Sequence, residues 1–186
     1  VFSVLFIGFL LVLNFFRSPL RNFKGDRDGV VVSSVDGTVV ALEEVYEDEY
    51  LHSRAIQLSV FMTIFNVHAN WYPVDGVVEV ADYHPGRFRA AYLPKSSSEN
   101  EHSSVLIRTT TGHKLLMRQI AGAIARRIVT YAHPGAEANL SSHMGFIKFG
   151  SRVDIYLPVD STILVKIGDK TTGGITPIAY LKQTKK

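Results

Sequence analysis

Apolar positions divide the chain into one long apolar stretch at its start and many short apolar runs after it. Residues 1–16 are almost wholly apolar, which predicts a helix. The later runs are short, rich in β-branched residues and separated by glycine, proline and polar residues at regular spacing. This pattern favours a mainly β fold, a sandwich or barrel, with a hydrophobic helix at the N-terminus. A length of 186 residues suits one domain with a sizeable core.

The predicted strands come with turn and loop signals. Asp36–Gly37 predicts a hairpin between two apolar runs, and Gly112–His113 predicts a second. Residues 43–49 are acidic and 94–104 polar, so both are expected to be loops, whereas 122–131 fits a helical turn or a strand equally well. The segment 165–181 resembles the hairpin of lipoyl- and biotinyl-type domains without their carrier lysine, which implies shared architecture only. The runs that predict strands are residues 29–40 (two strands), 58–68, 76–83, 105–110, 114–121, 144–158 (two strands), 162–167 and 176–181.

The N-terminal stretch has the features of a membrane-associating segment. A spanning helix needs about 20 apolar residues, so residues 1–16 are short for a crossing. A basic flank follows, and no small-residue cleavage site is present, which argues against a secretory signal. The segment 1–24 is therefore expected to associate with a membrane and keep its basic end on the cytoplasmic side. The alternative is a buried helix of the soluble core.

Charge and composition narrow the function classes. A net charge of +3 fits an anionic membrane surface or nucleic acid. No long Lys/Arg run and no interleaving of basic and aromatic residues occurs, so nucleic acid is the weaker option. Cysteine is absent, which excludes disulfides, thiol nucleophiles and cysteine metal sites. The six histidines other than His68 lack metal-ligand spacing with one another along the chain, and no metal is predicted.

Residues 144–158, M-G-F-I-K-F-G-S-R-V-D-I-Y-L-P, place a Gly150–Ser151 bond between two predicted strands. A lone Gly-Ser pair is ordinarily a bulge or bend. Here the sequence F-G-S-R-V-D-I-Y-L-P resembles the self-cleavage segment of the short, bacterial-type phosphatidylserine decarboxylases. Six further segments resemble that family in the same order. They are F-F-R-S-P-L-R (15–21), V-V-S-S-V-D-G-T-V-V (31–40), F-M-T-I-F-N-V-H-A-N (61–70), Y-H-P-G-R-F (83–88), K-S-S-S-E-N-E (95–101) and I-A-G-A-I-A-R-R-I (120–128).

The resemblance implies that the chain cuts itself between Gly150 and Ser151. Ser151 Oγ would attack the Gly150 carbonyl, with His68 as the base and Asp36 as the carboxylate behind it. Glycine at position 150 admits a bent backbone and an unhindered attack. Within the catalytic domain, 25–186, a β chain would end at Gly150. An α chain of 36 residues (186 − 150) would begin at Ser151, which becomes a pyruvoyl cofactor.

The reaction implied is decarboxylation of phosphatidylserine to phosphatidylethanolamine through a Schiff base on the pyruvoyl group. Archaetidylserine is the alternative substrate. Phe65 stands where longer relatives carry a second histidine, so either His68 also reprotonates the product or another group does. Arg126 and Arg127 are candidates for the lipid phosphate, with a solvated or salt-bridged pair as the alternative. Phe65 is a further candidate for binding the substrate. Phe15 and Phe16 line an acyl groove or belong to the core.

The sequence departs from the family's usual pattern at several points. Trp71 and His102 stand where arginine is common, and Ser34-Val35 replaces Pro-Ala. These differences concern substrate preference more than processing, because Asp36, His68, Gly150 and Ser151 are all present.

The implied partners are a membrane and its lipid substrate. The enzyme would lie at the cytoplasmic side of the cell membrane, peripherally or by its N-terminal anchor, and a homodimer is expected. The competing hypothesis is a membrane-anchored β-sandwich that binds lipid head groups without chemistry. Such a module has no reason to be cut at Gly150–Ser151.

Overall fold

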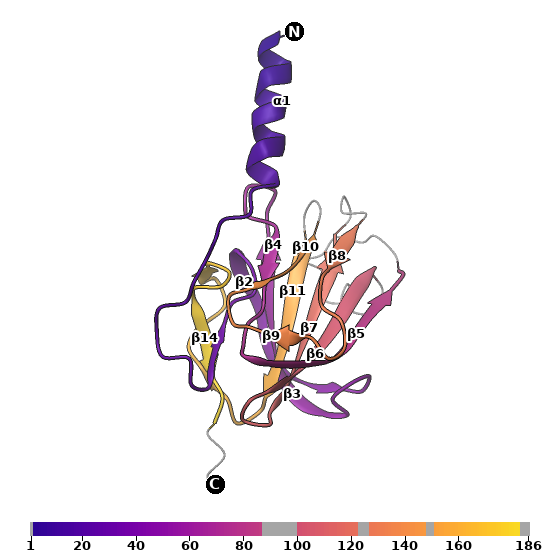
Figure 1. Ribbon diagram of the computed structural model, residues 1–186, viewed down its shortest axis with the longest axis vertical. Helices are drawn as coiled ribbons and strands as arrows, with labels where there is room; N and C mark the ends of the chain where they lie inside the picture. Colours follow the sequence, from indigo (N-terminus) through magenta and orange to yellow (C-terminus); the bar gives the residue numbers. More distant parts are fainter. Residues whose placement is uncertain (1, 87–99, 123–126, 148–150, 183–186) are drawn as a thin grey trace.

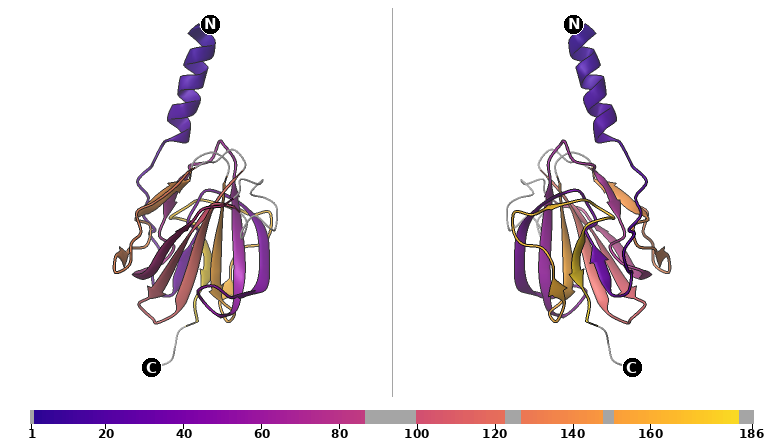
Figure 2. Two further views of the ribbon diagram at one scale, coloured as in Figure 1. Left: turned by 90° about the vertical axis from the view of Figure 1, so that its right-hand side faces the viewer. Right: turned by 90° about the vertical axis from the view of Figure 1, so that its left-hand side faces the viewer.

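The apolar start of the chain forms helix α1 (Phe2–Phe15), which projects from one end of a β-structure (Figure 1). The computed structural model describes residues 2–86, 100–122, 127–147 and 151–182. The side chains of α1 are exposed except that of Phe15, and both views in Figure 2 show the helix standing clear of the strands. Within these ranges no helix has the length and apolar character that a membrane crossing requires. The predicted N-terminal helix is thus confirmed, and it is not a buried helix of the core.

A curled sheet of eight antiparallel strands forms the body of the molecule. Strand β11 lies near its centre between β3 and β7, with Ser151 opposite Met62 on one side and Ala121 on the other. The strands in spatial order are β13 (Lys170–Thr171), β2 (Gly37–Glu47), β3 (Ser53–Met62), β11 (Ser151–Pro158), β7 (Lys114–Ala121), β6 (His102–Thr109), β5 (Gly76–His84) and β9 (Glu137–Ala138).

Bulges and close backbone approaches bend this sheet. The β2–β3 ladder shifts register between Val39 and Ala41, and each such bulge adds local twist. Gly37, which begins β2, lies so close to β3 that a Cβ there would stand 2.3 Å from the Phe61 carbonyl oxygen. Only glycine permits that approach.

Two three-stranded sheets cover one face of the large sheet, and the main core lies between them. Met144 and Ile178 of the small sheets pack with Leu58, Met117 and Ile155 of the large one, all fully buried. One small sheet has the order β1 (Val30–Val32), β14 (Pro177–Tyr180) and β12 (Thr162–Ile163). The other has the order β4 (Ala69–Trp71), β10 (His143–Ile147) and β8 (Ile128–Thr130).

The opposite face of the large sheet carries a smaller core and buried charges. Tyr50 and Leu51, from the turn between β2 and β3, cover Leu116 and Tyr156. Arg118 forms an ion pair with Glu47 under this cover. The mainly β fold with one N-terminal helix is confirmed, and the predicted hairpin around Gly112 is present as β6–β7, with Gly112 at φ +87°.

Three local predictions were wrong. Asp36–Gly37 does not close a hairpin, because β1 pairs with β14 while β2 pairs with β3 and β13. Gly37 also lacks the positive φ that a two-residue hairpin turn of this kind needs. The acidic segment is strand β2 as far as Glu47, whose buried carboxylate accepts hydrogen bonds from the backbone N–H groups of Glu49, Tyr50 and Leu51.

The third error concerns the end of the polar segment 94–104. Its residues from His102 onward begin strand β6, while 94–99 lie outside the described ranges. The ambiguous segment 122–131 contains strand β8, so the strand interpretation holds for its described end.

Candidate active site

Ser151 is the first residue of β11 and is fully buried. Its Oγ has no hydrogen-bond partner in the part of the chain that the structure describes. Gly150, the other side of the predicted cleavage site, lies outside the described residues. A buried hydroxyl without a partner costs stability, so Ser151 is a polar group that folding alone does not explain.

His68 lies at the same end of the molecule, between the turn that follows β3 and the start of β4. Its carbonyl oxygen accepts a hydrogen bond of 3.2 Å from Ile147 N, four residues before Ser151. Met62, which ends β3, is the register partner of Ser151. The chain connections on both sides of His68 therefore hold it at the edge where β11 begins, next to Phe15 at the end of helix α1.

The imidazole of His68 is buried and has a defined tautomer. Nδ1 lies 3.0 Å from the carbonyl oxygen of Asn66. A carbonyl only accepts, so Nδ1 carries the proton and Nε2 presents its lone pair. Nε2 has no partner among the described residues. This is the arrangement of a general base that is ready to take a proton.

Burial lowers the pKa of His68 to about 4, and this is the largest influence on the ring. The hydrogen bond to Asn66 raises the pKa, the charge of Arg17 lowers it and that of Asp36 raises it. Phe15 packs on the imidazole with ring centroids 4.2 Å apart. His68 is consequently neutral near pH 7 and able to accept a proton at Nε2.

Asp36 influences His68 through its charge, which raises the pKa of the imidazole, and not through a hydrogen bond to the ring among the described residues. Its Oδ2 accepts from Arg21 Nη2 at 2.9 Å, and its Oδ1 accepts from Gly173 N at 2.9 Å. No hydrogen bond joins Asp36 to His68 in the described structure, where the orienting contact comes from Asn66. Arg21 in turn lies over the Trp71 ring, 4.3 Å from its centroid.

A buried amide network behind His68 was not predicted from the sequence. Asn70 Nδ2 donates to the His68 carbonyl oxygen at 3.1 Å, and Gln119 Nε2 donates to Asn70 Oδ1. Ser103 Oγ completes the chain by donating to Gln119 Oε1 at 2.6 Å. All are fully buried. Asn70 belongs to the F-N-V-H-A-N segment, whereas no sequence signal marked Gln119 or Ser103.

Among the described residues, those predicted to bind the substrate lie outside the buried group formed by Ser151 and His68, except Phe15. Arg127 and Phe65 are exposed, and Arg126 lies outside the described residues. Phe15 is a core residue, packed with Phe146 and His68, while Phe16 is half exposed. The structure therefore brings Ser151 and His68 to one buried edge, with Asp36 close enough to act on His68 electrostatically.

Comparison with known proteins gives a consistent picture over nearly the whole chain. The sequence profile described as phosphatidylserine decarboxylase matches residues 9–179. The phosphatidylserine decarboxylase proenzyme of Parabacteroides distasonis is 58% identical over 185 residues, which cover 98% of this chain and 84% of that protein. The proenzyme of the same name from Phocaeicola vulgatus is 57% identical over 176 residues, 95% of this chain and 77% of that protein. The proenzyme from Cytophaga hutchinsonii is 46% identical over 171 residues, which cover 92% of this chain and 77% of that protein.

Proposed function

This chain belongs to the phosphatidylserine decarboxylase family, and from that premise we propose that it cuts itself before Ser151 and works through a pyruvoyl group made there. As a member of the family it is a self-processing decarboxylase that converts phosphatidylserine into phosphatidylethanolamine. The relatives' name specifies phosphatidylserine, and the archaetidylserine alternative has no comparable support. Family membership also disfavours a lipid-binding module without chemistry.

One observation carries the proposal: two buried polar atoms that have no hydrogen-bond partner among the described residues lie at the same edge of the fold. They are Ser151 Oγ and His68 Nε2. Leaving such atoms unpaired costs about 1–3 kcal/mol each, and unpaired buried groups in native proteins call for a functional explanation. The functional explanation proposed here is that Ser151 Oγ is a nucleophile and His68 Nε2 is the base that takes its proton. The same residues fit the formation of a pyruvoyl group at Ser151.

Self-processing follows from the chemistry of these side chains. His68 Nε2 takes the Ser151 hydroxyl proton, and Oγ attacks the Gly150 carbonyl carbon, so that the peptide bond becomes an ester and the Ser151 nitrogen leaves as an amine. Removal of the Ser151 Cα proton then expels the Gly150 carboxylate and leaves a dehydroalanine. Addition of water and loss of ammonia convert it into the pyruvoyl group. The net change is one water consumed and one ammonia released.

The same residues are available for the decarboxylation. The pyruvoyl group supplies a carbonyl that reacts with the amine of the serine head group and then an electron sink when CO2 leaves. In this proposal His68 Nε2 holds a proton and returns it to the product carbon. Phe65, at the position of the second histidine in longer relatives, is 65% exposed and offers no proton. His68 is therefore proposed to serve both steps.

We further propose that the end of the molecule bearing α1 faces the lipid bilayer. The apolar side chains of α1 are exposed, and so are those of Phe16, Ile64 and Phe65. Arg17, just after the helix, donates to the Phe65 carbonyl oxygen at 3.1 Å, which keeps this turn beside the end of α1. Arg127, exposed just before β8 at this end, is proposed to contact the lipid phosphate. The enzyme would lie at the cytoplasmic side of the cell membrane, peripherally or by an N-terminal anchor, and as a homodimer.

The test is the intact mass of the purified protein under denaturing conditions. The unmodified sequence should give two chains, and the smaller, starting at residue 151, should be lighter by one ammonia than a peptide that begins with serine. Ser151→Ala should give one uncut, inactive chain, and His68→Asn should slow cutting by about 10²-fold or more.

Matched controls remove a hydroxyl and an imidazole elsewhere. Ser161→Ala and the exposed-site change His133→Ala should both be cut at the normal rate. Normal cutting and activity in Ser151→Ala would refute the pyruvoyl proposal. Normal cutting in His68→Asn would remove His68 from the role of base while leaving the pyruvoyl group in place.

A further inference from the structure

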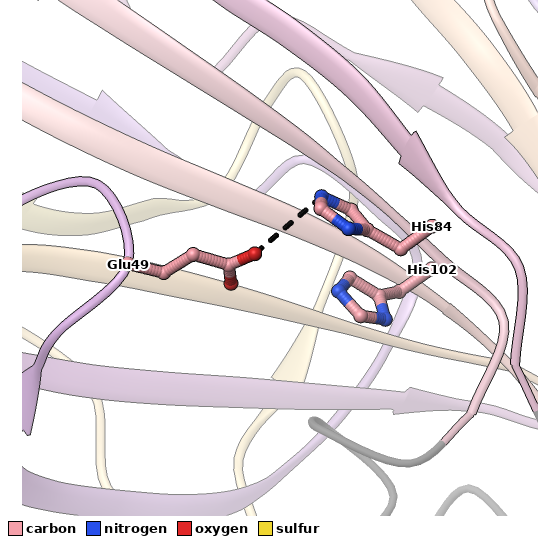
Figure 3. A group of neighbouring side chains, drawn as sticks. All are labelled: Glu49, His84 and His102. Carbon is pink, nitrogen blue, oxygen red and sulfur yellow. Dashed lines mark ion pairs between the residues drawn. The ribbon is translucent and has the colours of Figure 1, made fainter.

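Glu49, His84 and His102 converge on one point on the face of the large sheet opposite the main core (Figure 3). Glu49 belongs to the turn between β2 and β3. His84 ends β5 and His102 begins β6, and the two residues are register partners in the antiparallel pair. Their imidazole rings stack with centroids 4.6 Å apart and an interplanar angle of 13°. One side-chain atom from each of the three residues lies within 4.8 Å of the others.

His102 is oriented as metal-binding histidines usually are. Its Nδ1 lies 2.8 Å from the backbone carbonyl oxygen of Asn100, so this nitrogen is the donor and Nε2 presents a lone pair. The side chain is only 7% exposed, and Nε2 has no hydrogen-bond partner among the described residues. Figure 3 shows this nitrogen directed toward the Glu49 carboxylate. A backbone carbonyl that fixes the tautomer is the common outer contact of a ligating imidazole.

The carboxylate is also held on one side and open on the other. Arg118 Nη2 donates to Glu49 Oε2 at 2.5 Å, while Glu49 Oε1 lies 3.6 Å from His84 Nε2. The Tyr50 hydroxyl lies 2.7 Å from His84 Nε2 and 3.1 Å from Asp82 Oδ2. The charge of Arg118 is balanced by Glu47, which pairs with it at 3.0 Å. Because Glu47 balances the charge of Arg118, the negative charge of Glu49 remains available to a cation.

We propose that Glu49, His84 and His102 bind a divalent ion of the zinc type, which fastens the β2–β3 turn to the ends of β5 and β6. Two imidazoles and one carboxylate are a ligand set that zinc accepts, with bonds of about 2.0–2.2 Å and a tetrahedral arrangement. Ligand atoms in such a site lie about 3.4 Å apart by this geometry. The separation of 3.6 Å between Glu49 and His84 already approaches that value. A water or the Tyr50 hydroxyl takes the fourth position.

A simple ion pair accounts for less of the geometry. Protonated His84 paired with Glu49 would explain their contact, yet it would leave the buried Nε2 of His102 unsatisfied. An ion satisfies all three groups together, and the half-exposed Glu49 side chain has room to close on it. The spacing of histidines along the sequence predicted no metal, because His84 and His102 become neighbours only when β5 pairs with β6.

The experiment uses the full chain, freed of metal by a chelator, and titrates it with Co2+ as a spectroscopic substitute for Zn2+. We expect one Co2+ per chain at micromolar concentration, visible absorption bands of four- or five-coordinate cobalt, and their loss when Zn2+ is added. Zn2+ should also raise the melting temperature, because a ligand that binds only the folded state stabilises it.

Variants decide whether the three residues are the ligands. His84→Ala, His102→Ala and Glu49→Gln should each weaken binding by about tenfold or more, whereas His133→Ala should bind as the unmodified chain does. His84 and Glu49 are partly exposed, so their variants remain informative if the buried change His102→Ala prevents folding. Absence of stoichiometric binding would overturn the proposal, and so would binding that is unchanged in His84→Ala and Glu49→Gln.

Discussion

At the scale of single residues, the proposed chemistry depends on how burial changes the pKa of one imidazole, that of His68. His68 is fully enclosed, and the loss of water around it lowers its pKa more than any neighbouring charge raises it. The Asn66 carbonyl then determines which nitrogen carries the proton. A neutral ring with a free Nε2 is what the attack of Ser151 on the preceding carbonyl requires. In this proposal the base is produced by burial and one backbone contact, and no carboxylate among the described residues is hydrogen-bonded to it.

The lowered pKa of His68 predicts a loss of stability in mild acid. An ordinary histidine in the unfolded chain takes up its proton near pH 6.5, whereas folded His68 does so near pH 4. Between these values the unfolded state binds more protons, so stability falls as the pH falls through this window and is unaffected above it. The loss amounts to roughly 3 kcal/mol at its limit.

The measurement is the free energy of unfolding in urea from pH 7.5 to pH 4. It is made on the uncut chain Ser151→Ala and on the same chain carrying His68→Asn. The first should lose more stability with acid than the second. His102, whose pKa burial also lowers, is present in both and cancels in the comparison. If the free energy of unfolding falls equally with pH in the two chains, the claim that His68 is buried and neutral is contradicted.

At the scale of elements, an ion pair joins the linker between α1 and β1 to Asp36, a residue of the proposed active site. Arg21 in this linker pairs with Asp36 in the turn before β2, and it donates to the Gly173 carbonyl oxygen at 2.7 Å. Gly173 lies between β13 and β14. Three segments distant in the sequence therefore meet at Asp36. Its position near His68 depends on all of them.

Arg21→Ala is expected to destabilise the fold by about 2–3 kcal/mol, because it leaves the carboxylate of Asp36 largely buried without its cation. The side chains of Arg21 and Asp36 are 9% and 15% exposed. Arg27→Ala is the matched control in the same linker, since its partner Asp75 and Arg27 itself are 30% and 47% exposed. That change should cost about 1 kcal/mol or less. Denaturation midpoints measure the loss of stability in both variants. Equal losses would show that the buried Arg21–Asp36 pair stabilises the fold no more than the exposed Arg27–Asp75 pair.

At the scale of the whole molecule, everything proposed for the reaction lies at the end that carries α1. The start of β11 and the start of β4 lie there (Figure 1). The apolar side chains of the helix that projects from this end are exposed. A substrate whose acyl chains stay in a bilayer can present only its head group to the protein. An active site at the end proposed to face the membrane would shorten the distance that the head group must cover.

Deleting residues 1–13 should therefore abolish binding to phosphatidylserine-containing vesicles, because it removes most of the exposed apolar surface of α1. The deletion keeps Phe15, which packs on His68, so self-cutting should continue. Vesicle flotation measures binding. The control Lys185→Ser with Lys186→Ser lowers the positive charge and keeps the helix, and it should still float. Flotation of the deleted chain at the original level would contradict the proposed orientation.

The periodicity of apolar residues predicted where helices and strands lie more accurately than it predicted which strands pair with each other. The helix at the N-terminus and the strands around Gly112 follow from local pattern and turn chemistry. The Asp36–Gly37 pair carried the same local signal as a hairpin, yet the strands on either side of it enter different sheets. A turn signal says that the chain changes direction, and it does not say which strand comes to lie alongside.

The sequence by itself determined the family, the candidate residues Asp36, His68 and Ser151, and the mainly β class, because these depend on residue types in a fixed order. Only the tertiary structure decided the protonation of His68, since its pKa and tautomer result from burial and from the Asn66 carbonyl. It also decided that Asp36 bonds to Arg21 and Gly173. Desolvation and contacts between distant segments exist only after the chain has folded, and no local pattern of residues encodes them.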